Sequence, residues 1–134
     1  MNEKILVIDD SPTLRKLLRF YLEKKGYSVN EAHNGEMGLQ TITREFFDLI
    51  ILDMNMPVMT GLQVLETLKN KQDFSIPILI LSADKEEESK AAGIAFGASY
   101  YLTKPFKPEE VVARIEDILT ERRSRDASLD DLDF

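Results

Sequence analysis

Acidic and other polar side chains follow the apolar runs of this sequence, and they are its best candidates for chemistry. Asp9 and Asp10 follow the run ILVI, and Asp53 follows LIIL. Ser82 follows ILIL, and Lys104 follows SYYLT. Runs without a polar member are typical of strands buried on both faces of a parallel sheet. Because an unpaired buried charge is costly, we expect these groups in a crevice at the carboxyl edge of such a sheet, where ligands bind.

Three carboxylates in one crevice need a positive partner, because two like charges about 4 Å apart repel by roughly 4 kcal/mol at an effective dielectric near 20. The chain has no cysteine and a single histidine, His33, which excludes thiolate and multi-histidine metal sites. Oxygen ligands favour a hard cation. We therefore predict a bound Mg²⁺, ahead of Ca²⁺ or Mn²⁺.

The same groups are the parts needed to receive a phosphoryl group, a transfer that relies on positioning and charge neutralisation. Asp53 is the expected acceptor and would form an aspartyl phosphate. Lys104 and the cation would neutralise the phosphoryl oxygens, and the Ser82 hydroxyl would donate a hydrogen bond to one of them.

Strands and helices alternate along the chain and must position these residues. The pattern predicts strands over 4–9, 27–32, 49–53, 76–81 and 99–103. It predicts helices from Pro12, over 35–45, from Leu62, over 84–96 and from Pro108. Such alternation indicates a doubly wound α/β fold, a five-stranded parallel sheet in the flavodoxin-like order 2-1-3-4-5 with five helices. The Ala-rich segment 84–96 has little apolar area and is expected to be the most mobile helix.

Composition limits the class of protein. A chain of 134 residues with 43% hydrophobic content suits a single domain with a core of its own. A formal net charge of −7 argues against nucleic-acid binding. No apolar run approaches the length of a membrane span or a signal peptide core, so we expect a cytoplasmic protein without a membrane partner.

Four motifs together resemble the response-regulator receiver family, specifically its stand-alone CheY type. They are the acidic pair in VIDDS, the acceptor in ILDMNMPVMTG, the serine in ILILSA and the lysine in YYLTKPF. The resemblance covers roughly residues 4–120. It implies the CheY-like version of the flavodoxin-like fold.

The resemblance also implies roles at the acidic site. Asp10, Asp53 and the backbone carbonyl of Asn55 would bind Mg²⁺, with Asp9 acting partly through water. Asn55 and Asp84 occupy positions at which the family tunes access of the hydrolytic water, so they are expected to influence phosphate lifetime.

A conformational switch is the second implication of the resemblance. It implies a cis peptide bond between Lys104 and Pro105, and it places Tyr101 at the aromatic switch position. Contact between Ser82 and the phosphoryl group would draw the loop after the fourth strand inward, and Tyr101 would follow. The face formed by helix four, strand five and helix five would then change. Serine replaces the commoner threonine at position 82, so coupling to Tyr101 is expected to be looser.

The function implied is that of a phosphoprotein in two-component, phosphorelay signal transduction. The chain has no evident donor histidine, since His33 is interpreted as a surface residue, so the phosphoryl group would come from a histidine kinase or phosphotransfer protein. Self-phosphorylation from small phosphodonors and autodephosphorylation would be its only reactions. With no room for an effector domain after residue 123, we expect output through a separate partner in chemotaxis, motility or another relay, with a phosphatase as a further partner.

The last residues, 124–134, lie outside the resemblance, which leaves 1–123 as the receiver domain. They read SRDASLDDLDF with a net charge of −3, and such a short acidic segment is expected to be disordered when free. Leu129, Leu132 and Phe134 form a regular apolar set, similar to the acidic C-terminal helix with which the phosphatase CheZ binds CheY. The tail is either a docking peptide for a partner or for the domain's own helix-four to helix-five face, or a solubilising tail.

Other interpretations stay open at this stage. Asp9 and Asp10 could only cap the first helix, Ser82 could be a turn residue, and Tyr101 could simply pack. A haloacid-dehalogenase-type phosphatase also uses an Asp nucleophile with Mg²⁺, but it needs a second acid two residues later, where this chain has Asn55. A flavodoxin-like cofactor binder would need a Gly-rich phosphate loop after the first strand, and the sequence has none there.

Overall fold

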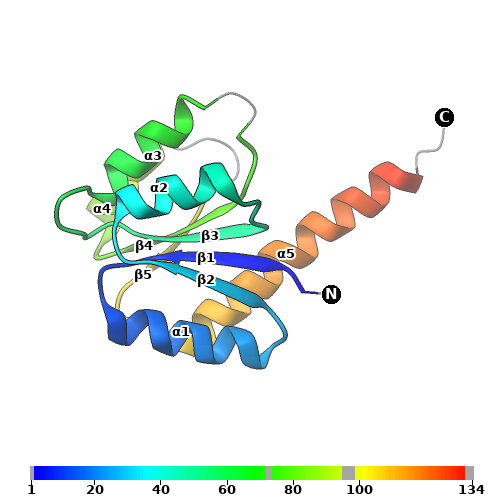
Figure 1. The fold of residues 1–134 in the computed structure, drawn as a ribbon. Helices are drawn as coiled ribbons and strands as arrows, with labels where there is room; N and C mark the ends of the chain where they lie inside the picture. Colours follow the sequence, from blue (N-terminus) through cyan, green and yellow to red (C-terminus); the bar gives the residue numbers. More distant parts are fainter. Residues whose placement is uncertain (1, 72–73, 95–98, 132–134) are drawn as a thin grey trace.

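A parallel five-stranded sheet forms the centre of the computed structural model, which describes residues 2–71, 74–94 and 99–131 (Figure 1). Its strands lie in the order β2-β1-β3-β4-β5. They are β1 (Lys4–Ile8), β2 (Ser28–Ala32), β3 (Leu49–Asp53), β4 (Ile78–Ser82) and β5 (Ser99–Thr103). The order 2-1-3-4-5 that the sequence predicted is confirmed.

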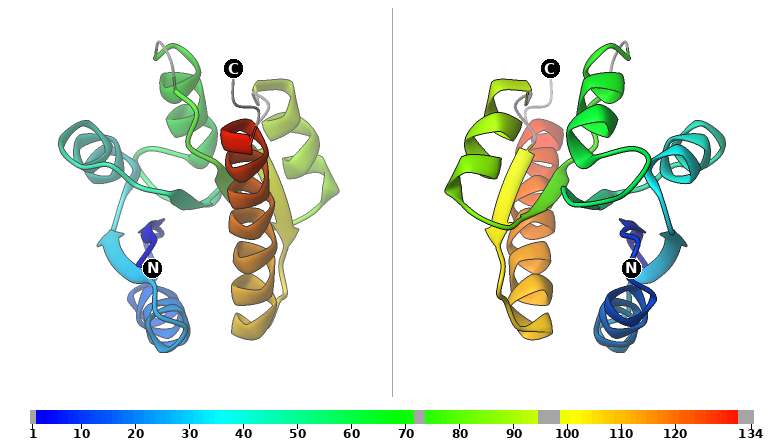
Figure 2. Two further views of the ribbon diagram at one scale, coloured as in Figure 1. Left: turned by 90° about the vertical axis from the view of Figure 1, so that its right-hand side faces the viewer. Right: turned by 90° about the vertical axis from the view of Figure 1, so that its left-hand side faces the viewer.

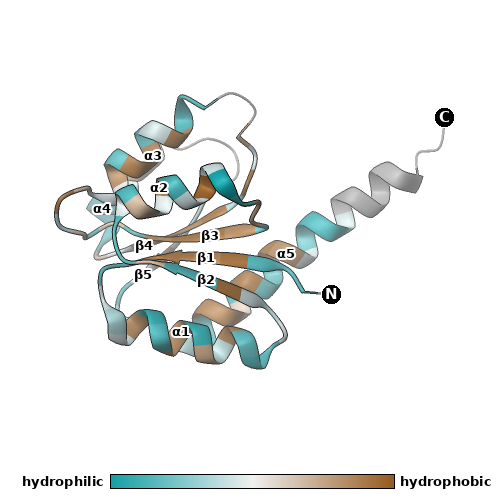
Figure 3. Cartoon of the chain, in the orientation of Figure 1, coloured by the Kyte–Doolittle hydropathy of each residue, from teal (hydrophilic) through white to brown (hydrophobic). Residues whose placement is uncertain are grey.

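Helices follow the strands in alternation and cover both faces of the sheet. They are α1 (Pro12–Lys24), α2 (Gly35–Arg44), α3 (Gly61–Lys69), α4 (Lys85–Ile94) and α5 (Pro108–Asp131). Side chains of α1 and α5 pack on one face of the sheet, and those of α2, α3 and α4 pack on the other. The apolar strands therefore lie between two layers of helix, as their hydropathy in Figure 3 illustrates.

Two strand starts and two helix starts differ slightly from expectation. Helix α3 begins at Gly61, one residue before the predicted Leu62. The second strand begins at Ser28 and the fourth at Ile78, directly after Pro77, which has no N–H to donate to a sheet ladder. Helix α4 begins at Lys85 because Asp84 is its cap: the Glu87 N–H donates to the Asp84 carboxylate over 2.9 Å. Its last described residue is Ile94, and residues 95 and 96 lie outside the described part.

The last helix, α5, continues through the segment expected to be disordered. It runs to Asp131 because residues 109–131 contain neither Gly nor Pro to end it. Figure 1 shows it projecting beyond the sheet. The base of this projection is held by an ion pair between Arg123 and Glu3. The docking role of Leu129, Leu132 and Phe134 stays a prediction, because these side chains lie outside the described residues.

Among the described residues, none of the helices combines the length and the apolarity that crossing a membrane requires.

Candidate functional site

The polar residues predicted from the strand ends meet at one edge of the sheet. This edge lies opposite the chain termini in Figure 1, where the loops after β1, β3 and β5 converge. Carboxylate oxygens of Asp9, Asp10 and Asp53 all lie within 4.8 Å of one another. A cavity of about 450 Å³ opens here, with Lys104 and Asn55 among its lining residues. Strand β2 lies on one side of β1, and β3 and the later strands lie on the other, so the strand order reverses between β1 and β3. Open α/β sheets bind ligands at this switch point.

Asp53 and Lys104 form the central ion pair of this site. The Lys104 ammonium donates to Asp53 Oδ1 over 2.8 Å, and Asp53 is 2% exposed. Burial raises the pKa of the Asp53 carboxyl, and the hydrogen bond from Lys104 opposes that rise. The Lys104–Pro105 peptide bond is cis, the geometry that the family resemblance implied. The Lys104 N–H also donates to the Ser82 carbonyl over 2.7 Å, which ties the lysine to the end of β4.

The loop after Asp53 returns close to the strand before α3 begins. The Gly61 N–H donates to the Met54 carbonyl over 3.2 Å. A Cβ atom at position 61 would lie 2.7 Å from the Met54 Cα and 2.8 Å from the Asp53 carbonyl oxygen. Only glycine fits such a close approach, so Gly61 helps to hold Asp53 at the crevice.

Asp9 carries a buried oxygen without a hydrogen-bond partner. Its Oδ1 accepts from the Ser11 N–H over 2.8 Å, but Oδ2 is buried and unpaired. Burial, with a smaller contribution from the Asp53 charge, raises the pKa of the Asp9 carboxyl to about 6. The α1 cap is Ser11, whose hydroxyl accepts from the Leu14 N–H, so capping does not explain Asp9.

This donor set fits a hard divalent cation. Three carboxylates share the crevice, Lys104 supplies one positive charge, and the orphaned Asp9 oxygen has no protein donor. Oxygen-only ligands of this kind suit Mg²⁺. The role of the Asn55 carbonyl stays a prediction. The Asn55 side chain is exposed, with its amide 3.4 Å from Glu87, and Asp84 caps α4, so their influence on phosphate lifetime also remains a prediction.

Ser82 is buried at the end of β4, and its hydroxyl already has a partner. Ser82 Oγ donates to Glu88 Oε2 over 3.3 Å, and Thr103 Oγ1 donates to the same carboxylate oxygen. Tyr101 lies half-buried on β5, where burial and then the Glu88 charge raise the pKa of its hydroxyl. Sequence reasoning missed Glu88, because three successive glutamates at a helix start read only as favourable N-terminal charge.

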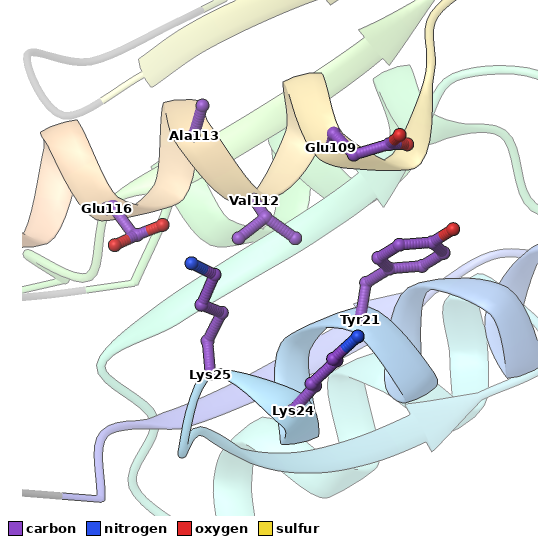
Figure 4. A pocket seen from close by; sticks show the side chains of 7 residues that line it. All are labelled: Tyr21, Lys24, Lys25, Glu109, Val112, Ala113 and Glu116. Carbon is purple, nitrogen blue, oxygen red and sulfur yellow. The ribbon is translucent and has the colours of Figure 1, made fainter.

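A second cavity of about 480 Å³ lies between α1 and α5 (Figure 4). Lys25 and Glu116 point toward one another across it, and Val112 forms part of its floor. Its lining mixes charges of both signs and includes none of the five strand-end residues. The acidic crevice is therefore the candidate site, because there, among the residues that the structure describes, three carboxylates and a lysine converge.

Comparisons with known proteins agree with this geometry. The family model described as the response regulator receiver domain matches residues 5–116. The chain is 44% identical to the alkaline phosphatase synthesis transcriptional regulatory protein PhoP of Bacillus subtilis (strain 168), over 96% of this chain and 52% of PhoP. It is 40% identical to the transcriptional regulatory protein ResD of the same organism, over 87% of this chain and 48% of ResD. The chain thus spans about half the length of these curated relatives.

Solved structures show the same fold. The chemotaxis response regulator CheY4 of Vibrio cholerae superimposes with a TM-score of 0.80 at 31% identity, covering 88% of this chain and 99% of CheY4. The response regulator TrrA of Thermotoga maritima, solved in complex with Mg²⁺ and beryllofluoride, gives a TM-score of 0.75 at 32% identity, covering 87% and 98%. Because the family model matches most of its length, this chain belongs to the response regulator receiver family.

Proposed function

We propose that this receiver domain accepts a phosphoryl group on Asp53 from a histidine kinase or phosphotransfer protein. The observation that carries the proposal is the buried Asp53 carboxylate, paired with Lys104 and clustered with two further acids at the crevice. A buried carboxylate held at a crevice by a lysine is positioned to act as a nucleophile.

In the proposed reaction, an Asp53 oxygen attacks the phosphorus atom of the donor. The new O–P bond forms as the donor's bond to phosphorus breaks, and the donor leaves with that bond's electron pair. Lys104 stays beside the carboxylate and balances charge on the phosphoryl oxygens. Ser82 can donate its hydroxyl hydrogen to one of those oxygens once that hydrogen is free.

Asp9, Asp10 and Asp53 are the side chains that would hold Mg²⁺. The ion would supply further positive charge for the phosphoryl oxygens. Asp9 would keep its Oδ1 on the Ser11 N–H and offer the unpaired Oδ2 to the ion or to one of its waters. The domain would turn over only its own phosphoryl group and would not be an enzyme toward other substrates.

The output of the phosphorylated domain is also a proposal. Tyr101 and the surface of α4, β5 and α5 would change and alter binding to an output partner. The curated relatives are named as transcriptional regulators, and CheY4 is named as a chemotaxis regulator. Control of transcription and stand-alone chemotaxis or motility signalling are therefore both proposals for this chain, as is its cytoplasmic location.

Intact mass spectrometry tests the acceptor. Wild type and Asp53→Asn are each incubated with acetyl phosphate, with and without Mg²⁺. We expect a gain of one phosphoryl group in wild type only and only with Mg²⁺. An adduct of equal yield in Asp53→Asn would overturn the assignment.

If no adduct is seen in either protein, binding of beryllofluoride with Mg²⁺ separates fast hydrolysis from the lack of an acceptor site. Binding by wild type alone would indicate fast hydrolysis, whereas no binding would contradict the proposal. Nothing in the described residues favours the dehalogenase-type or flavodoxin-like alternatives. At the position where the former needs a general acid, the chain has the exposed Asn55.

A further inference from the structure

Glu88 connects the ends of two neighbouring strands to a helix. Ser82 and Thr103 are register partners at the carboxyl ends of β4 and β5. Both hydroxyls donate to one oxygen of Glu88, which is 17% exposed and projects from α4. Figure 2 shows α4 beside β5, at the edge of the sheet. One carboxylate thus joins three elements.

The Ser82 hydroxyl cannot donate its hydrogen to Glu88 and to a phosphoryl group at the same time. A carboxylate only accepts hydrogen bonds, so both hydroxyls must direct their single hydrogen at Glu88. A phosphoryl oxygen is likewise an acceptor. When Ser82 turns its hydrogen toward a phosphoryl group on Asp53, its bond to Glu88 has to break.

Helix α4 buries little apolar surface among its described side chains. Among its described side chains, Ala91 alone is buried. The ion pair from Glu88 to Lys85 spans 3.8 Å within the same helix, and Lys85 is 89% exposed. The hydrogen bonds to Glu88 are therefore polar side-chain contacts that tie this weakly buried helix to β4 and β5.

We propose that Glu88 is a latch, which holds α4 against β4 and β5 in the unphosphorylated domain and competes with the phosphoryl group for the Ser82 hydroxyl. Glu88 is a positioning residue in this scheme, because it acts through Ser82. The inference rests on the proposed function of Asp53 as acceptor. Phosphorylation would release half of the latch and loosen α4, while Thr103 keeps its own bond to Glu88.

Beryllofluoride affinity in the presence of Mg²⁺ tests the competition. Glu88→Ala frees the Ser82 hydroxyl, so we expect its dissociation constant to fall about tenfold, which corresponds to about 1.4 kcal/mol. The matched control is Glu86→Ala, which removes the same charge from the same helix at a residue whose side chain is 78% exposed. We expect the control to bind as wild type does.

Two further variants separate hydrogen bonding from general charge repulsion. Glu88→Gln loses the charge but keeps an acceptor oxygen, so it should stay within about threefold of wild type. Placing Glu88→Ala in a Ser82→Ala background should abolish its effect, because the contested hydrogen is gone. A Gln variant that binds as tightly as the Ala variant, or an unchanged effect without Ser82, would overturn the latch.

Hydrogen exchange gives an independent measurement. In unphosphorylated Glu88→Ala, the amides of α4 should exchange faster than in wild type. The rate should be at least that of wild type bound to beryllofluoride, because the variant loses both hydrogen bonds to position 88. Unchanged exchange in α4 would contradict the proposal. Wild type that fails to bind beryllofluoride at all would instead overturn the proposed function, so the two failures are distinguishable. Thermal unfolding of every variant shows that each is folded.

Discussion

The two sides of the functional edge of the sheet differ in whether their polar side chains have partners. At β1 and β3, the acids Asp9 and Asp53 are buried with one lysine between them, and an Asp9 oxygen has no partner. At β4 and β5, the hydroxyls of Ser82 and Thr103 share the carboxylate of Glu88 and need nothing more.

This difference separates binding from response. On the acidic side, the carboxylates outnumber their positive partners, so binding of a cation would lower the free energy of the site. This side is therefore suited to bind a cation and a phosphoryl group. The satisfied side must give up an internal hydrogen bond before it can contact a ligand. Because ligand contact requires the loss of that internal hydrogen bond, this side is suited to couple ligand binding to a change in structure.

Removing Lys104, the lysine that pairs with Asp53, should have the largest effect. We expect Lys104→Met to slow phosphorylation by acetyl phosphate by about 10²- to 10³-fold, because a preorganised positive group facing the phosphoryl oxygens is lost. Phosphorylation is followed by intact mass at saturating Mg²⁺. Lys107→Met, at an exposed lysine three residues later, is the control and should react as wild type does. Equal rates in the two variants would show that Lys104 is a structural ion pair only.

Removing an acid from the under-neutralised side should stabilise the metal-free protein. Asp9→Asn should raise the free energy of unfolding in EDTA at pH 7 by about 2–3 kcal/mol, because a carboxyl whose folded pKa lies near 6 is ionised at a cost. Urea unfolding measures it.

The pH dependence of Asp9→Asn follows from the same shift. A raised folded pKa favours the folded state only while the group is protonated. The advantage of the variant should therefore be absent below about pH 4, grow between pH 4 and 6, and level off above. A destabilised Asp9→Asn protein would contradict the view of this side as under-neutralised.

Removing an acid from the satisfied side should have the opposite sign. Glu88→Ala should lower the free energy of unfolding by about 1–2 kcal/mol, because two hydroxyls lose an ionised acceptor. Glu86→Ala again serves as the exposed control. If both Asp9→Asn and Glu88→Ala stabilised the domain, the contrast between the two sides would fail.

A strained residue beside the acidic side should give the smallest effect. Val58, in the loop after Asp53, has φ of 69° and is 93% exposed. A β-branched residue in that region is strained, and Val58→Gly should stabilise the domain by about 0.5–1 kcal/mol after the greater chain entropy of glycine is subtracted. Val58→Ala, which keeps a Cβ atom, should recover less of this in urea unfolding.

Most of the fold could be predicted because its signals are local. The apolar runs that end at Asp53 and Ser82 identify buried strands, and their alternation with helices leaves few topologies. The same pattern brings Asp9, Asp10 and Lys104 to one edge. Element ends were less certain: a proline before β4 and a capping aspartate before α4 moved two of them. The extension of α5 to Asp131 was not predicted, because the acidic composition of residues 124–134 indicated disorder. The absence of Gly and Pro from residues 109–131 was the signal for a continuous helix.

The parallel sheet, the strand order, the converging acids and the family motifs could all be inferred from the amino-acid sequence. These follow from periodicity, chain connectivity and the cost of burying charge, all of which act along the chain. Which side chains pair with one another could be seen only in the three-dimensional structure. That Glu88 rather than Glu87 receives the Ser82 and Thr103 hydroxyls, and that an Asp9 oxygen is left without a donor, depends on how α4 and the loops lie over the sheet edge. Hydrogen bonds form only over about 3 Å, so small rotations of a helix choose their partners.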